Sequence, residues 1–474
     1  MLFDSAKNKY KVNGVLPYLQ LRCYQKAFFR ILKTKGGCMK KVYSSFALLA
    51  LLGTSGHAVE FQVTGSLDAF SKVGFNNQKI NKAENIYPTE SFMSVIGMLE
   101  VNADFFSQDQ KDGGQKLTGS VGAAVGGPIL DSTRLLEGGS QMDNYIGSQF
   151  VLYNAHLNYT TTKDDHSLNV KIGRYASSAQ FYSGYTQGFE ATYAYKGFKA
   201  WWFSSFGRGS VGGGQWLFDF GNKPANSPTG ALNHGVHAFK PSYTFENGLY
   251  VSPFVYFSPE FYVAPMLELG FDSNPAFKGE GFRSTTKVIV MAPFHNKPVQ
   301  NDYRYQDKAG AGGQTLSIKQ QFDVNNYNFG LGLYKNFGHA NAFVGTYGNA
   351  AIGGWDFWTG SVYDLAGALS NVVTKDATTG YVFAGGEHGK LSWTTLARLT
   401  FSPRADEQAA LVSVGYAFPY NLKLWVKLEW QNVTTHKGYT ISNSTGINMD
   451  TATKLDKDQT SDRSHAMVLL SYSF

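Results

Sequence analysis

The chain has 474 residues, of which 43% are hydrophobic, and it contains 52 glycines, 36 phenylalanines and 28 tyrosines. Residues 1–58 hold ten of the 42 basic residues but only Asp4 among the 35 acidic ones, so the remainder carries 32 basic and 34 acidic residues. The formal net charge of +7 therefore belongs to the first 58 residues and does not indicate nucleic-acid binding. Both cysteines lie in the same segment, which fits an exported bacterial envelope protein without disulfides.

Residues 39–58 have the layout of a secretory signal peptide. A short basic start precedes the apolar run 46–52, and small residues precede a predicted cleavage between Ala58 and Val59. The apolar run is far shorter than the roughly 20 residues that a membrane-spanning helix needs. Residues 1–38 are then either an over-extended gene start or a long leader, and the sequence leaves both open.

From Glu60 onward, apolar residues recur at every second position in segments of about ten residues. This spacing is typical of strands with one apolar face. The clearest segment has outward Leu422, Leu424, Val426, Leu428 and Trp430, interleaved with Lys423, Trp425, Lys427 and Glu429. No later stretch is apolar for long enough to predict a membrane-spanning helix. A closed barrel also satisfies every backbone group in lipid, so residues 59–474 are predicted to form an all-β, antiparallel transmembrane β-barrel.

The predicted strands are joined alternately by short turns and long polar loops, as expected when turns face the periplasm and loops face outward. Eighteen strands result, or sixteen if 115–125 and 379–385 are loop, with both termini in the periplasm. The long loops are predicted at 126–147, 208–233, 293–324 and 433–463, and a short turn at 336–339. The strands are predicted at 60–75, 92–106, 115–125, 148–160, 166–174, 188–195, 198–207, 234–245, 249–257, 261–270, 282–292, 325–336, 339–349, within 350–389 around Tyr381–Phe383, and at 390–401, 408–418, 421–432 and 464–474.

The last strand resembles the signal that the barrel-assembly machinery reads. Apolar residues occupy alternate positions, and the chain stops on Phe474 with Tyr472 two residues before it. We therefore predict that Tyr472 and Phe474 form the assembly signal.

The register of the last strand also predicts which charged side chains face the barrel interior. Charges of both signs are costly in a dry core but natural in a water-filled lumen. They predict a channel wall that orients polar or ionised solutes, although the same charges could instead pair and brace the barrel. The pore-lining candidates are Glu100, Lys171, Glu190, Lys199, Glu268, Lys287, Arg398, Lys423, Lys427 and Glu429.

Other chemistry finds little support in the sequence. Residues 385–392 have the wrong glycine spacing for a phosphate loop, and a strand follows instead of a helix. The ten histidines lack metal-ligand spacing, so no metal and no cofactor are predicted. No local Ser/His or Asp/His arrangement predicts an enzyme.

Several segments resemble the Hof-type outer-membrane proteins of Helicobacter and its relatives. They are Phe61–Phe75, Tyr87–Phe92, Tyr145–Tyr153 and the Tyr-Ser-Phe end, and the resemblance spans residues 59–474. Val170–Tyr175 and Gln187–Phe189 are distantly similar to the OprD group of porins. That resemblance implies eighteen strands, inward-folded loops and a basic ladder along the pore, but no complete ladder can be traced here.

We therefore predict a porin of the bacterial outer membrane for passive diffusion of small hydrophilic solutes. The alternatives are a surface adhesin and a structural barrel without a conducting pore. The candidate constriction loops are 126–147 and 208–233. The expected partners are outer-membrane lipid, lipopolysaccharide, the barrel-assembly machinery and the solutes, with a homo-trimer left open and no nucleic acid.

Overall fold

The computed structural model describes residues 59–474 except 80, 85, 111–112, 133–145, 178, 181, 183, 223–233, 260–261, 296–312, 339–370, 440 and 442–453. The predicted signal peptide, the segment 1–38 and Ala58 lie outside the described residues, so the cleavage between Ala58 and Val59 stays a prediction. The elements of the described residues are strands, apart from two short 3-10 helices, η2 (Lys82–Glu84) and η5 (Asn371–Val373). Among the described residues, no helix has the length and apolar character needed to cross a membrane.

The strands are β1 (Glu60–Gly74), β2 (Phe92–Gln110), β3 (Gly113–Asp131), β4 (Phe150–Lys163), β5 (His166–Ala176), β6 (Tyr185–Tyr195), β7 (Phe198–Gly212), β8 (Trp216–Asn222), β9 (Val236–Thr244), β10 (Leu249–Ser258), β11 (Tyr262–Asp272), β12 (Phe282–Met291), β13 (Phe294–His295), β14 (Gly313–Val324), β15 (Tyr327–Gly338), β16 (Thr378–His388), β17 (Leu391–Phe401), β18 (Ala405–Ala417), β19 (Leu422–Thr435), β20 (Gln459–Asp462) and β21 (His465–Ser473).

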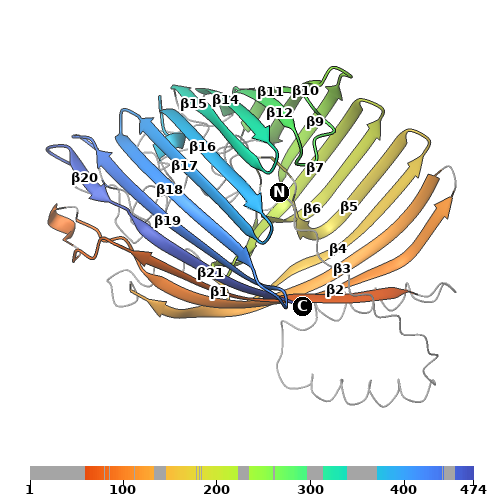
Figure 1. Cartoon of the computed structure of the whole chain (residues 1–474), viewed down its shortest axis with the longest axis horizontal. Coiled ribbons are helices and arrows are strands. Elements are labelled where there is room, and N and C mark those ends of the chain that lie inside the picture. The colour runs from red at the N-terminus through yellow and green to blue at the C-terminus, as the bar shows by residue number, and fades with distance from the viewer. Residues whose placement is uncertain are drawn as a thin grey trace, which may run out of the picture.

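The sheet closes on itself to form an 18-stranded antiparallel barrel, as predicted. Each long strand pairs with the next along the chain, and β21 pairs with β1 to close the ring. The short strands β8, β13 and β20 only extend pairings with β7, β11 and β19. Figure 1 shows the tilted strands and places β1 between β2 and β21.

The two ends of the barrel differ in their connections. At one end, which we call the turn end, tight turns join the strands and β1 begins beside the end of β21. At the opposite loop end, longer segments such as 75–91 and 436–464 connect the strands. Short turns belong to the periplasmic side of outer-membrane barrels and long loops to the external side. The turn-end connections include 164–165, 196–197, 245–248, 325–326, 389–390 and 418–421.

One predicted loop is in fact partly a strand. The segment 293–324 contains β14, whose outward apolar residues Leu316, Ile318, Phe322 and Val324 are interrupted by Gln320. A two-residue turn with Asn325 at φ 51° joins β14 to β15. Because Gln320 breaks the outward apolar alternation, the pattern did not separate β14 from loop.

The neighbouring predictions shift accordingly. The turn predicted at 336–339 is wrong at 336–338, because β15 continues to Gly338. The predicted strand 339–349 lies outside the described residues, so β14 takes its place in the total of eighteen. The two segments that would have reduced the total to sixteen are strands β3 and β16.

The outward face of the barrel carries an apolar belt. Leu67, Leu428 and Leu470 are 52%, 49% and 42% exposed and lie on one face of their strands, as expected for residues that contact lipid. Near the turn end, the ring of Phe474 lies over Gly65, where a Cβ atom would come within 2.4 Å of the ring. The two residues also exchange both backbone hydrogen bonds at 3.0 Å. Glycine at this position therefore lets the first and last strands close against an aromatic ring.

Candidate functional site: the barrel interior

The strand register places all ten predicted pore-lining residues on the inward face. Lys427, for example, pairs across the sheet with Ser413 and Met467, while the exposed Leu428 beside it points outward. Five candidates are buried, and five are at least partly accessible. The buried ones are Glu190, Glu268, Arg398, Lys427 and Glu429, and the accessible ones are Glu100, Lys171, Lys199, Lys287 and Lys423.

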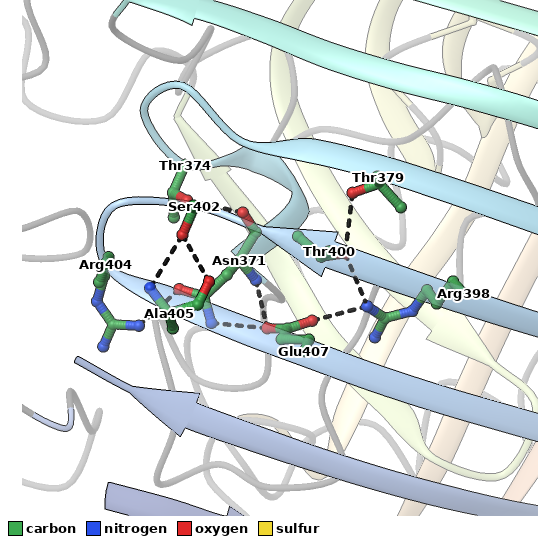
Figure 2. A network of polar contacts seen from close by, with 9 residues as sticks. All are labelled: Asn371, Thr374, Thr379, Arg398, Thr400, Ser402, Arg404, Ala405 and Glu407. Atoms are coloured by element: carbon green, nitrogen blue, oxygen red, sulfur yellow. Dashed lines mark hydrogen bonds and ion pairs between the residues drawn. The ribbon is translucent and has the colours of Figure 1, made fainter. Parts of the chain in front are cut away.

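A buried polar network lies on the wall near the loop end, at the tops of β17 and β18 (Figure 2). Arg398 Nη1 is 2.7 Å from Glu407 Oε2, and both side chains are 0% exposed. The other carboxylate oxygen of Glu407 accepts from the backbone N–H and the Nδ2 of Asn371, both at 2.6 Å. Arg404 Nη1 donates to Asn371 Oδ1 at 2.6 Å. Two arginines and one carboxylate thus hold η5 against the inner wall.

A second charge cluster lies where the barrel closes. Lys72 on β1 forms a 2.6 Å ion pair with Glu90, and Lys427 forms a 2.5 Å ion pair with Glu429 on β19. His465 Nε2 on β21 is 3.5 Å from Glu429 Oε2. All five side chains are at most 3% exposed. These groups bridge the first strand and the last two long strands instead of facing water.

Midway along the wall, ion pairs are partly open to solvent. Glu268 accepts from Lys240 and from Lys287, both at 2.9 Å. The side chain of Lys287 is still 36% exposed, and Lys319 lies directly opposite it on β14. Glu190 accepts from Trp201 Nε1 at 2.7 Å.

Toward the turn end the wall is more accessible. Lys199 and Lys423 are exposed, and Lys171 and Glu100 are partly exposed. The Lys171 ammonium lies 5.2 Å from the ring centre of Tyr175, and Glu100 accepts from Asn154 Nδ2 at 2.8 Å.

A hairpin crosses the interior near the loop end. The tip between β7 and β8 contacts β1 and β2, which are not adjacent to β7 in the barrel. Ser94 Oγ on β2 donates to the carbonyl of Gly214 at 2.5 Å. Leu217 on β8 is 0% exposed and packs with Phe70 and other inward residues. The predicted constriction loop 208–233 therefore folds inward over its described part, 208–222. In the other candidate constriction loop, 126–147, residues 126–131 belong to β3. Ile146 forms an isolated β-bridge with Leu217.

Two further segments enter the interior without having been predicted. In the described part of 177–184, Tyr182 is 1% exposed, accepts a hydrogen bond from Ser205 Oγ at 3.2 Å and packs on Phe203. Gln180 in the same segment accepts from Lys240 at 2.7 Å. The second segment contains η5, where Asn371 is 1% exposed.

The sequence missed several members of these clusters. Glu407 lies on the inward face just before the predicted strand 408–418, and Lys319 lies in the segment predicted as loop. Extending the period-2 pattern by one position would have found Glu407. Glu90 is in a loop and no pattern marks it.

Burial raises the pKa of Tyr87 in the same loop to about 12.

Comparison with solved structures identifies the fold. The chain resembles Acinetobacter baumannii OccAB4 with a TM-score of 0.55 and 13% identity, covering 88% of this chain and 98% of that one. It resembles Pseudomonas aeruginosa OccK2 (OpdF) in complex with glucuronate with a TM-score of 0.55 and 9% identity, covering 88% and 98%. It resembles Pseudomonas aeruginosa OpdK with vanillate with a TM-score of 0.54 and 10% identity, covering 88% of this chain and 98% of that one.

A search of curated proteins found no match. Residues 46–474 match the model of a family described as "Putative outer membrane protein", which confirms the predicted location in the outer membrane. The match covers the barrel entirely and begins in the apolar run before it. The chain therefore belongs to this family of outer-membrane proteins.

Proposed function

We propose that the protein is a porin through which small hydrophilic solutes diffuse passively, and that it has no catalytic role. The observation that carries this proposal is the presence of accessible cations on the inner wall of a closed barrel. Lys199 and Lys423 are exposed near the turn end, and Lys287 is partly exposed midway. A barrel with a purely structural role needs no solvated charge, since an apolar or fully ion-paired inner wall would suffice. Solvated charge on the inner wall is instead typical of a water-filled lumen.

The accessible charges favour anions as solutes. Four of the five accessible candidates are lysines, and Glu100 is the exception. Cations that outnumber acids among these accessible candidates attract anionic solutes and steer them inward. Two proteins of the same fold, OccK2 (OpdF) and OpdK, were solved with glucuronate and vanillate, which are both carboxylates. This supports small organic anions as the solute class for the present chain.

The buried candidates have a different role in this proposal. Arg398, Lys427 and Glu429 are in ion pairs at the loop end, so they brace the wall and the segments packed on it, and do not guide solutes. The narrowest part of the route then lies at the level of the inward-folded segment 208–222, and the open lysine wall forms a vestibule on the turn side.

The expected partners follow from the location. We propose that Tyr472 and Phe474, which face outward and are 44% and 54% exposed, carry the assembly signal for the barrel-assembly machinery. Outer-membrane lipid and lipopolysaccharide would surround the apolar belt. A homo-trimer stays a prediction.

The test is single-channel current through refolded residues 59–474 in a planar bilayer with a salt gradient. We expect discrete current steps and an anion preference that falls in the Lys199→Gln/Lys423→Gln double variant. Lys335→Gln is the matched control, because Lys335 lies on the outward face opposite Leu316. A silent bilayer with protein shown to be folded would overturn the porin proposal and favour an adhesin or a structural barrel.

A further inference from the structure

A polar hollow of about 590 Å³ opens at the loop end of the closure between the first and last strands. Phe75, Asn77 and Gln78, which directly follow β1, form one side. Asn432 of β19 with Thr460 and Asp462 of β20 form the other side. Its volume falls in the range of small-molecule sites.

The hollow faces outward and lies directly above the apolar belt. Asn432 is two residues beyond Trp430, which is 50% exposed on the outward face. Asp462 is the direct cross-strand partner of Asn432, so their side chains share that face. Phe75 is 53% exposed. Aromatic residues at the edge of the belt mark the membrane interface, so the hollow is at the level of the lipid head groups.

The chemistry of the lining matches a saccharide. Carboxamides both donate and accept hydrogen bonds, as sugar hydroxyls do, and the exposed Phe75 ring offers an apolar face to sugar C–H groups. The side chains of Asn77, Gln78 and Asn432 form no hydrogen bond within the described part of the chain, so their bonding capacity is available. The lining contains one acid and no base, which disfavours a phosphate.

The two sides of the hollow are held in place before any ligand binds. Asn76 Nδ2 donates to the Asp462 carbonyl at 3.2 Å, and Thr89 Oγ1 donates to the same carbonyl at 3.0 Å. The Phe75 N–H donates to the carbonyl of Ser464 at 3.0 Å. The buried Arg463 donates to the carbonyls of Tyr87 and Pro88 at 2.9 and 3.0 Å. A preorganised site loses less entropy on binding.

We propose that this hollow binds the core saccharide of lipopolysaccharide in the surrounding outer leaflet. The outward direction and the position above the apolar belt favour a membrane glycolipid over a solute in transit. The site is separate from the lumen, so it is independent of whether the barrel conducts.

The test is a calorimetric titration of the purified barrel with rough lipopolysaccharide from the native strain, with its acid-released core oligosaccharide and with lipid A alone. We expect rough lipopolysaccharide and the free core to bind and lipid A to bind much more weakly. The Asn77→Ala/Asn432→Ala double variant should weaken core binding by roughly tenfold, since each substitution removes hydrogen bonds to the sugar. Phe75→Ala should weaken it independently of those bonds.

Gln115→Ala is the matched control, because Gln115 is an exposed carboxamide at the turn end, and it should leave core binding within about twofold. Heat-modifiable electrophoretic mobility verifies that every variant is folded. Absence of core binding, equal binding by lipid A, or equal binding by a neutral oligosaccharide absent from the core, such as maltotriose, would overturn the proposal. So would core binding that the double variant leaves unchanged.

Discussion

The loop-end and turn-end halves of the inner wall use the same kinds of residue in different ways. Near the loop end, Arg398 and Glu407 form a fully buried pair beneath an inward-folded segment. Near the turn end, Lys199 and Lys423 lie exposed on the same inner face. The difference teaches that inward orientation alone does not make a residue part of a channel wall. What decides is whether a connecting segment packs over it, and within the described part of the chain such segments come from the loop end.

The largest effect is expected from removing the carboxylate in the loop-end network. Glu407→Ala would remove the carboxylate that neutralises the buried Arg398 and accepts from Asn371, which costs about 3–5 kcal/mol of unfolding free energy. Urea titration of the folded barrel, followed by tryptophan fluorescence, measures this loss.

The adjacent Asp406→Ala is the matched control for that change. Asp406 pairs with His436 at 3.3 Å, but the two side chains are 38% and 27% exposed, so the loss should stay below about 1 kcal/mol. Equal losses for the two variants would contradict the distinction between buried and open charges.

An intermediate effect is expected at the tip of the interior hairpin. Gly214 has φ of 67°, and a Cβ atom there would lie 2.8 Å from Phe70 Cβ on the opposite wall. Gly214→Ala should displace the hairpin, raise single-channel conductance and cost about 1–3 kcal/mol of unfolding free energy.

Gly213→Ala separates displacement from backbone strain. Gly213 has a similar φ of 58°, but nothing lies within 4 Å of its added Cβ. It should therefore leave the conductance unchanged. If both variants conduct alike, the hairpin does not set the width of the channel.

The smallest effect on stability is expected at the turn end, and there selectivity should respond instead. Lys423 and Lys427 point inward from the same strand, but Lys423 is exposed and Lys427 is 3% exposed beside Glu429. Lys423→Gln should change the unfolding free energy by at most about 0.5 kcal/mol while shifting the reversal potential toward cations.

Lys427→Gln should do the reverse. It leaves Glu429 buried without its close cation, so it should cost about 3–5 kcal/mol while moving the reversal potential little. A selectivity change at Lys427 as large as at Lys423 would show that the loop-end half of the wall also contacts permeating ions.

The sequence by itself determined the class of fold, the strand number and the inward face. Period-2 alternation reports which side of a strand contacts lipid, and this signal survives wherever outward residues are apolar. It failed at β14, where Gln320 breaks the outward apolar alternation. The total of eighteen was right although one predicted strand lies outside the described residues and β14 was predicted as loop.

Only the tertiary structure decided which inward charges are accessible. The sequence treated Arg398 and Lys423 alike, because each occupies an inward position of an alternating strand. Their difference arises from contacts with residues far along the chain, such as Asn371 of η5 with Glu407. The hollow at the closure likewise combines segments 386 residues apart, around Asn76 and Asp462. Alternation is a local property of one strand, whereas packing over the wall depends on where a distant loop folds.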